Sequence, residues 1–454
     1  MLPPSSDPDA APAAAAPEAA TSEAGAGAAA ASDALVRELA GMPGIDLVPD
    51  VTLADLTTLR IGGRPRALLE CATAEAVTEA VRALDSAGRP VLVVGGGSNL
   101  VVADGDLDLV VVAVRNREVQ YLEEPGPASA ATPVGAAGAS ATESPRLIVR
   151  AGAGLTWDDL VAQTVEQGYG GLECLSGIPG SVGATPVQNV GAYGVEVSQI
   201  LHRVRWYDRA TGIDEWVAPN ALGLAYRTSV LKNTDTAVVL EVEFRLDPAG
   251  RSEPIRYAEL AGRLGVSPGE RADPAMVRRT VLELRRGKGM VLDDDDEDTW
   301  SAGSFFTNPV IPESELPILR ARVAGKVGVE LAERMPAFAA DGGVKLSAGW
   351  LIERAGFSKG HPASSSSPSP SPSPSPSSTS SLSSASSSPR SSSPSQGPPQ
   401  PRARLSTKHT LALTNRGGAT ADDVITLARE VRDGVRDAFG VELRPEPVWV
   451  GGSI

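Results

Sequence analysis

The sequence predicts a mixed α/β fold built from more than one domain. Short apolar runs typical of strands alternate along the chain with segments whose apolar residues recur at helical spacing. The chain has 454 residues, a length that suggests two to three domains. A third observation is a glycine-rich stretch at residues 170–194, which suits neither a helix nor a strand. The fold is therefore expected to be organised around this stretch.

The composition excludes several classes of protein. A formal net charge of −15 argues against nucleic acid as a partner, because binding a phosphate backbone needs a basic face. Two cysteines are too few for a disulfide framework, and the three histidines lie far apart, so we expect no metal site. The sequence has no run of about 18 apolar residues, and its acidic N-terminus lacks the basic region that begins a signal peptide. These features predict a soluble, cytoplasmic protein with no membrane contact.

Three segments are expected to lie outside any core. Residues 1–32 are mostly Ala, Pro, Ser and acidic residues, which predicts a disordered tail. Residues 124–145, rich in Pro, Ala and Gly, predict a surface loop. Residues 362–403 are mostly Ser and Pro and predict a disordered insertion. Because lengthening a flexible loop adds little entropic cost, the domain around the insertion should still fold.

The first amphipathic segment predicts a helix that begins after Thr73. The Thr73 side chain can cap the helix N-terminus, and Gly88 is placed to end the helix. Val77, Val81 and Leu84 fall on one face at helical spacing. That face is the one expected to be buried.

A glycine loop follows this helix. A strand predicted at 90–94 leads into Gly95, Gly96, Gly97, Ser98, Asn99 and Leu100, and another strand is predicted at 109–114. Successive glycines expose backbone N–H groups in a row, and Ser98 and Asn99 add side-chain donors, so the loop suits phosphate oxygens. An ordinary hairpin turn would explain the same residues. The pattern is not the G-x-G-x-x-G dinucleotide fingerprint, because no helix is predicted after it.

The later elements are predicted from periodicity and capping signals. Strands are expected at 147–149, 200–207 and 237–246 and from residue 405, and helices after Thr156, within 250–290 and within 340–357. Thr420 and Asp423 match a capping box. The helix that they begin would turn inward Val424, Leu427, Val431, Val435 and Phe439. An apolar segment at 441–450 ends the pattern.

Two loops between these elements carry chemically distinctive side chains. The acidic run 293–298 is expected to be a solvated loop, with a metal site as the alternative. Residues 301–309 read SAGSFFTNP, which predicts a serine presented beside two exposed aromatic rings.

The glycine-rich stretch itself has two interpretations. It reads GGLECLSGIPGSVGATPVQNVGAYG and is nearly free of charged residues. Glycine at this density marks backbone that turns at positive φ or approaches another molecule closely. The stretch is therefore either a structural loop or a bed of N–H groups under an anionic cofactor.

Five motifs occur in one order along the chain: GIPGSVGATPVQNVGAYG, YRTSVLK, AGSFFTNP, ADGGVKLSAGWLI and LRPEPVWVG. Together they closely resemble the UDP-N-acetylenolpyruvoylglucosamine reductase family, over residues 50–361 and 404–451. The resemblance implies a two-lobed FAD-binding region of the vanillyl-alcohol-oxidase (PCMH) type and a C-terminal α/β substrate-binding domain. The implied parts are 33–248 for FAD, 249–442 for substrate and 443–454 for a segment returning to the active site.

The same resemblance implies the ligands. FAD would be bound without a covalent link, and NADPH would be the co-substrate in making UDP-N-acetylmuramate for peptidoglycan, and so for cell-wall growth and division. Besides residues 95–100, the FAD contacts implied are Gly177, Ile178, Pro179, Gly180, Ser181, Val182, Gly183, Gly191, Ala192 and Tyr193. Small molecules are the only partners implied, and a monomer is expected.

The reaction implied by the resemblance explains three further residues. Reducing an enol ether conjugated to a carboxylate builds negative charge on that carboxylate, so fixed donors and a proton source are needed. Arg227 resembles the family's catalytic arginine, whose planar fork of donors suits a carboxylate. Ser304 matches the proton donor, and Glu446 the third catalytic residue, whose pKa partial desolvation should raise. The alternatives are a surface ion pair for Arg227 and a small turn residue for Ser304.

Substrate contacts are implied at four more positions. Tyr257, within PIRYAEL, resembles the longer subtype of the family, in which a tyrosine-bearing loop closes over the uridine diphosphate. The other implied contacts to the diphosphate and sugar are Arg285, Lys288 and Asn308.

Two other functions remain open. An FAD-dependent sugar or alcohol oxidase would use the same cofactor fold, but many such oxidases attach the flavin through a histidine in the first lobe. This sequence has no histidine before residue 200. An inactive nucleotide-binding homologue would also keep the fold, and the presence of Arg227, Ser304 and Glu446 argues against it.

Overall fold

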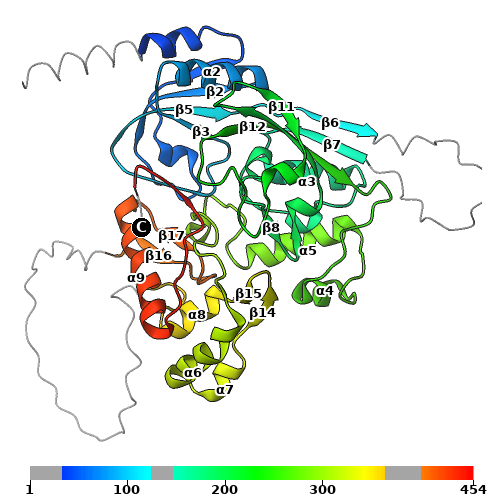
Figure 1. Ribbon diagram of the computed structural model, residues 1–454, viewed down its shortest axis with the longest axis vertical. Coiled ribbons are helices and arrows are strands. Elements are labelled where there is room, and N and C mark those ends of the chain that lie inside the picture. Colours follow the sequence, from blue (N-terminus) through cyan, green and yellow to red (C-terminus); the bar gives the residue numbers. More distant parts are fainter. Residues whose placement is uncertain (1–32, 124–146, 363–399, 453–454) are drawn as a thin grey trace, which may run out of the picture.

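The computed structural model describes residues 33–123, 147–362 and 400–452. The tail predicted at 1–32, the loop predicted at 124–145 and nearly all of the insertion predicted at 362–403 lie outside the described residues. Figure 1 shows two sheets and their helices in the upper part of the molecule and the later helices α6, α8 and α9 below them. No helix in the described part is long and apolar enough to cross a membrane.

The first sheet has four strands in the order β1-β2-β5-β3. Their bounds are Ile45–Val48 for β1, Arg64–Cys71 for β2, Val91–Val94 for β3 and Asp106–Val114 for β5. Helix α2, Ala74–Ser86, begins where the sequence predicts, because the Thr73 hydroxyl accepts a hydrogen bond from the Ala76 amide at 3.1 Å. The three side chains predicted on its inner face are fully buried. The prediction of this helix is confirmed.

The second sheet has five antiparallel strands in the order β11-β10-β12-β7-β6. Their bounds are Val119–Glu123 for β6, Leu147–Gly152 for β7, Leu201–Asp208 for β10, Asp214–Val217 for β11 and Ala237–Leu246 for β12. Helix α3, Trp157–Glu166, packs on it, with the Trp157 ring edge-on to Phe244 at 5.5 Å. Thr156 makes no side-chain cap, contrary to the prediction. Its backbone instead bridges to Ser181 in the glycine-rich stretch.

The glycine-rich stretch forms only short elements, as its composition indicates. They are the single turns η2, Glu173–Leu175, and η3, Val182–Ala184, and the two-residue strand β8, Gly191–Ala192, which pairs with β9, Val195–Glu196. The other single turns are η1, Leu53–Leu56; η4, Val197–Gln199; η5, Pro219–Leu222; η6, Glu297–Thr299; and η7, Glu313–Glu315.

One hydrophobic core, here called the first core, joins both sheets to the helices that follow them. Helices α4, Ala258–Leu264, and α5, Pro274–Arg286, pack into this core through Leu260, Val277 and Val281. The chain beyond residue 249 is therefore shared between this core and the next.

A second core lies beneath the first sheet and is built from the C-terminal elements. Its strands are β13, Val310–Ile311; β14, Ala337–Ala340; β15, Gly343–Leu346; β16, Ala403–Leu405; and β17, Leu413–Asn415. Its helices are α6, Leu316–Val327; α7, Val329–Glu333; α8, Ala348–Ala355; and α9, Ala421–Phe439. The capping box at the start of α9 is present, and the five side chains predicted to point inward are buried.

One loop prediction is wrong, and another holds for only part of its run. Phe305 and Phe306 are buried, not exposed, because their rings pack together at 5.3 Å within the second core. The acidic run is not simply solvated: Asp298 is only 4% exposed and accepts hydrogen bonds from the backbone and hydroxyl of Thr407. Asp298 also pairs with Arg416, so this loop fastens the segment that contains β17.

The single strand predicted from residue 405 is two short strands, β16 and β17, which pair antiparallel. The chain on either side of the Ser/Pro insertion is joined at this pair. The Leu405 amide donates to the His361 carbonyl at 2.7 Å, and the Gly360 amide donates to the Leu405 carbonyl at 3.1 Å. The side chain of His361 pairs with Glu430 of α9 at 2.9 Å.

A glycine in the middle of α9 makes a close helix contact possible. A Cβ at Gly434 would overlap the ring of Phe357, which follows α8. We expect Gly434→Ala to lower the free energy of unfolding by about 1 kcal/mol, because overpacking outweighs the better helix propensity of alanine. The matched control is Gly325→Ala in α6, where a Cβ meets nothing within 4 Å. Urea unfolding followed by circular dichroism should show that the control is unchanged or more stable; stabilisation by both substitutions would contradict the expectation.

Candidate functional site

The two glycine segments predicted to hold a cofactor pack directly against each other. A Cβ at Gly96 would lie 2.6 Å from the Cα of Gly180, and a Cβ at Gly95 would overlap the hydroxyl of Ser181. The Ser98 hydroxyl donates to the Pro179 carbonyl at 3.1 Å. The structure therefore brings residues 95–98 and 179–181 together, and only glycine fits at these contacts.

The loop after β3 carries a row of unused donors. Within the described residues, the backbone amides of residues 95–99 donate to no protein group. Gly97 turns at φ +58°, and a Cβ there would overlap the Leu56 carbonyl. Successive free N–H groups in a glycine turn form a concave site for anions. The donor set therefore fits the pyrophosphate of FAD, although the fold of β3 and β4 is not the dinucleotide fingerprint.

The C-terminal segment returns to this loop. Strand β18, Val448–Val450, pairs parallel with β4, Leu100–Val102, and the Val448 amide donates to the Asn99 carbonyl at 2.9 Å. The Asn99 amide group also donates to the Glu446 carbonyl at 3.3 Å and to the Gln188 side chain at 2.8 Å. These contacts place Glu446 beside both glycine segments.

Arg227 and Glu446, distant in sequence, meet at this point. Arg227 Nε lies 3.4 Å from Glu446 Oε1. The Arg227 guanidinium also donates to the carbonyls of Gly191, at 2.5 Å, and Asn189, at 3.3 Å. Arg227 is thus fixed against the end of the glycine-rich stretch and is not an ordinary surface ion pair.

The backbone of Arg227 is in an unusual conformation. It lies in a tight turn between Ala225 and Thr228, whose backbones bond each other, and its φ is +55°. A non-glycine residue in the left-handed region costs free energy and is held there only by its surroundings. The turn therefore presents the guanidinium at a conformational cost that the contacts above offset.

Burial shifts the ionisation of the groups around Arg227. Burial raises the pKa of Glu446, while Arg227 and then Lys232 act in the opposite direction. Lys232 donates to the Arg227 carbonyl at 3.0 Å, and burial lowers its own pKa. The raised pKa of Glu446 agrees with the expectation for a partly desolvated carboxyl.

Ser304 lies next to this group. It is half-buried, and its hydroxyl bonds to no other residue in the described part of the chain. The carbonyl of the following residue, Phe305, accepts from the Glu446 amide at 2.8 Å. The Phe305 ring packs on Trp449 at 6.1 Å, so the buried aromatics fix the serine loop against the C-terminal segment.

Tyr193 and Tyr257 form a second part of the site. Their rings meet edge to face at 5.4 Å, and Tyr257 is the residue before α4. Arg285, at the end of α5, has a buried Nε with no hydrogen-bond partner among the described residues, while its Nη2 donates to the Met290 carbonyl at 2.7 Å. Burial lowers the pKa of Arg285 to about 10. An unpaired buried guanidinium nitrogen is suited to an anionic ligand.

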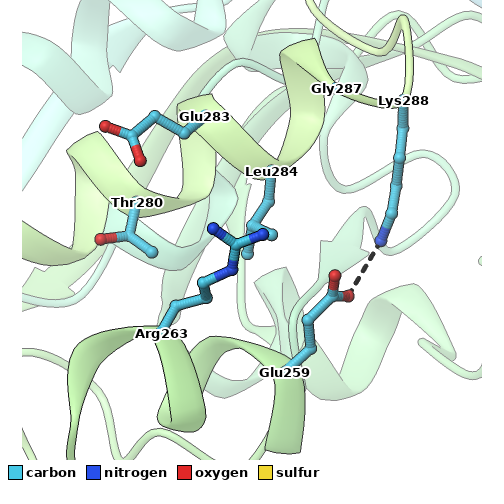
Figure 2. Close-up of a pocket in the computed structure, with 7 residues that line it drawn as sticks. All are labelled: Glu259, Arg263, Thr280, Glu283, Leu284, Gly287 and Lys288. Atoms are coloured by element: carbon cyan, nitrogen blue, oxygen red, sulfur yellow. Dashed lines mark hydrogen bonds and ion pairs between the residues drawn. The ribbon is translucent and has the colours of Figure 1, made fainter.

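A pocket of about 250 Å³ opens between α4 and α5, next to these residues. Figure 2 shows Arg263 pointing from α4 towards Leu284 of α5, and Lys288 reaching across to Glu259. The Lys288 ammonium lies 3.0 Å from the Glu259 carboxylate. Lys288 is therefore held at the pocket rim by an exchangeable ion pair.

Asn308 is placed apart from this pocket, on the side of Tyr226. Its side-chain oxygen accepts from the Ala348 amide at 3.0 Å, at the start of α8. Burial raises the pKa of Tyr226, and hydrogen bonds with Asn308 oppose that shift. Tyr226 also lies under the Lys345 ammonium, 4.9 Å from its ring centre.

Sequence reasoning missed His409 and Lys359. Burial, and then the charges of Lys288, Lys359 and Arg285, lower the pKa of His409 to about 4. These side chains come from three separate segments of the chain. The only local signal was a histidine within the strand predicted from residue 405, which carries no information about its neighbours. The described residues contain no cluster of His, Cys, Asp or Glu that could hold a metal.

Several known proteins have sequences similar to that of this chain. Residues 65–213 match a family model described as an FAD binding domain, and residues 395–450 match the UDP-N-acetylenolpyruvoylglucosamine reductase, C-terminal domain. The UDP-N-acetylenolpyruvoylglucosamine reductase of Nocardia farcinica is 52% identical over 416 residues, which cover 92% of this chain and 93% of that protein. The one of Mycobacterium tuberculosis is 49% identical over 417 residues, covering 90% and 96%. The crystal structure of the Thermus caldophilus reductase has a TM-score of 0.49 at 20% identity, covering 89% of this chain and 98% of that one.

The contact between the glycine segments can be tested with Gly96→Ala. The added methyl group would push residues 95–98 away from Gly180, and we expect the dissociation constant for FAD to rise about tenfold. The ratio of flavin to protein after dialysis measures this loss. Gly262→Ala in α4 is the matched control, because a Cβ there meets nothing within 4 Å. Equal flavin retention by both variants would show that the contact does not shape the site.

The neutral state of His409 predicts how stability depends on pH. Its pKa is lower in the folded protein than in the unfolded chain, so below pH 6.5 the unfolded chain binds a proton that the folded protein does not. Stability should therefore fall as the pH drops from about 6.5 to about 4, by an amount on the order of 3 kcal/mol. Urea titrations should show a smaller acid-induced loss for His409→Gln. A loss of the same size in both proteins would refute the assignment.

Proposed function

The chain belongs to the UDP-N-acetylenolpyruvoylglucosamine reductase family, and from this premise we propose which of its residues carry out the reaction. The protein is an FAD-dependent oxidoreductase that reduces UDP-N-acetylglucosamine enolpyruvate in peptidoglycan synthesis. Its fold combines a PCMH-type FAD-binding region with the family's C-terminal domain. The observation that most supports a shared mechanism is the meeting of Arg227 with Glu446 beside the Ser304 loop.

The free amides of residues 95–99 would hold the FAD pyrophosphate. The segments 177–183 and 191–193 line the rest of the cofactor site, since the first packs on the glycine loop and the second on Arg227. When bound, FAD would supply the hydride for the enolpyruvyl group, with NADPH as its source. The chain's own residues must then place the substrate and manage its charge and its proton.

Arg227 stabilises the carboxylate of the enolpyruvyl group. Negative charge grows on that carboxylate as the neighbouring double bond is reduced, and a fixed guanidinium lowers the free energy of that charge without reorganising. The two carbonyls of Gly191 and Asn189 hold the guanidinium in place beforehand. Because the fork of donors is planar, lysine would not replace it.

Ser304 delivers a proton to the carbon next to the carboxylate. Its hydroxyl is free of protein partners within the described residues, so it is available to a ligand. Glu446 orients Arg227 through their 3.4 Å contact, and burial raises the pKa of Glu446 above its usual value, which suits a carboxyl that takes part in proton transfer. These roles make Arg227, Ser304 and Glu446 the catalytic group.

The substrate diphosphate is bound near the cationic side chains at the end of α5. Arg285 and Lys288 were expected there, and the pKa shift of His409 adds His409 and Lys359 to the same region. Tyr257, with its ring against Tyr193, closes this side of the site. Asn308 contributes through Tyr226, on the opposite side.

The alternative functions are less well supported than reduction of the enolpyruvyl sugar. Relatives about half identical over nine-tenths of the chain carry the reductase name, not that of an oxidase. An inactive homologue would have no need to keep Arg227 in a costly conformation. A cytoplasmic location, a monomeric state and the domain boundaries at 248 and 442 stay predictions.

Stopped-flow absorbance tests both the function and the role of Ser304. NADPH should bleach the flavin of the wild-type protein, and UDP-N-acetylglucosamine enolpyruvate should restore its colour. Ser304→Ala should keep the first half-reaction within about twofold and slow the second by about 10²–10⁴-fold, the usual contribution of a positioned acid. Ser301→Ala, in the same loop, is the control. Equal losses in both half-reactions would refute the role of Ser304, and a wild-type protein inert to the enolpyruvyl sugar would refute the function.

A further inference from the structure

Glu173 is a buried carboxylate that the mechanism above does not use. It is 0% exposed, and it is the only Asp, Glu, Lys or Arg within the glycine-rich stretch. Buried carboxylates are normally paired with a cation, because losing water is costly. In the described part of the chain Glu173 has no ion pair, and its carboxylate binds backbone amides instead. Its place must therefore be explained by its hydrogen bonds.

The two oxygens of Glu173 bind two different segments. Oε2 accepts the Gly171 amide at 2.6 Å, within the glycine-rich stretch. Oε1 accepts the Glu253 amide at 2.7 Å, in the segment that leads to α4. A carboxylate can accept at both oxygens at once, whereas an amide side chain cannot. Glu173 is thus a strut between the cofactor segment and residues 253–257.

The segment beyond Glu253 is held so that its end reaches the active site. Ile255 is fully buried in the first core, and it bonds through its backbone to Glu270 and Gly269. Two residues later, Tyr257 places its ring against Tyr193. The distance between residues 253–257 and the glycine-rich stretch therefore determines where the Tyr257 ring lies.

The two ends of the glycine-rich stretch contact residues 247–256, the part of the chain that leads up to Tyr257. Gly170 exchanges two backbone hydrogen bonds with Asp247, and a Cβ on Gly170 would overlap the Arg251 carbonyl. At the other end, a Cβ on Gly194 would lie 3.3 Å from the Cβ of Arg256. Between these two backbone contacts, Glu173 adds a side-chain hydrogen bond to the Glu253 amide.

We propose that Glu173 is a positioning residue for substrate binding: through the Glu253 amide it sets the Tyr257 segment relative to the floor of the flavin site. The proposal rests on the proposed function, because it takes Tyr257 to contact the substrate. Glu173 itself touches neither ligand. Glu173 links the cofactor segment to the segment that carries Tyr257, and so fixes the distance between the two.

A double-mutant cycle tests this link. In Glu173→Gln one oxygen still accepts, but the new NH₂ group faces a backbone N–H, and one of the two segments must move. We expect the KM for the enolpyruvyl sugar to rise about tenfold, while flavin content and the rate of flavin reduction by NADPH stay within about twofold of wild type. If Glu173 acts through Tyr257, Glu173→Gln with Tyr257→Ala should raise KM no more than Tyr257→Ala alone.

Glu253→Gln is the matched control. It changes the neighbouring carboxylate, whose only ion pair is a 4.0 Å contact with Arg271, and it keeps the backbone amide that Glu173 binds. The KM of this variant should equal that of the wild type. Multiplying effects in the double mutant, or a parallel loss of flavin, would overturn the proposal while leaving the wild-type activity, and so the proposed function, intact.

Hydrogen exchange on the unaltered protein keeps the idea testable if Glu173→Gln does not fold. The Glu253 amide, bonded only to a buried carboxylate, should exchange as slowly as the amides of β12 in the first core. Fast exchange at Glu253, with slow exchange in β12, would show that no such strut exists in solution.

Discussion

The parallel pairing of β18 with β4 is the constraint on which the site depends. Strand β4 continues directly from the glycine loop, and β18 follows Glu446 by one residue. Successive side chains of β4 point to opposite faces, so Val101 enters the second core while Val102 joins a small cluster under the first sheet that also contains Val450. A slip of one residue would turn these side chains to the wrong faces and carry Glu446 away from Arg227.

The glycines are needed for close contact between two stretches of backbone more than for flexibility. Gly95, Gly96 and Gly180 lie where two loops far apart in sequence touch through their backbones, and any side chain would separate them. The close contact lets the loops direct several backbone amides at one anion. Looser packing would move these amides apart. Arg227 follows a related rule, because a strained turn is stable only when the groups around it bond its side chain firmly.

Local signals in the sequence were enough for the elements with regular patterns. The cap of α2, the capping box and apolar face of α9 and strand β12 follow from spacing within a few residues, and all are confirmed. The burial of Phe305 and Asp298 was missed, because it depends on partners more than a hundred residues away. The surroundings of His409 were missed for the same reason, since charge shifts depend on tertiary neighbours that no local pattern encodes.

The backbone bonds between His361, Gly360 and Leu405 hold together the two ends of the chain that flank the Ser/Pro tract. Because the chain closes on itself at the base of the tract, the number of residues beyond that base does not alter the register of β16 and β17. This region can therefore be lengthened or shortened without loss of these hydrogen bonds. The same property makes it a natural place to graft an affinity sequence or a fluorescent reporter without disturbing catalysis.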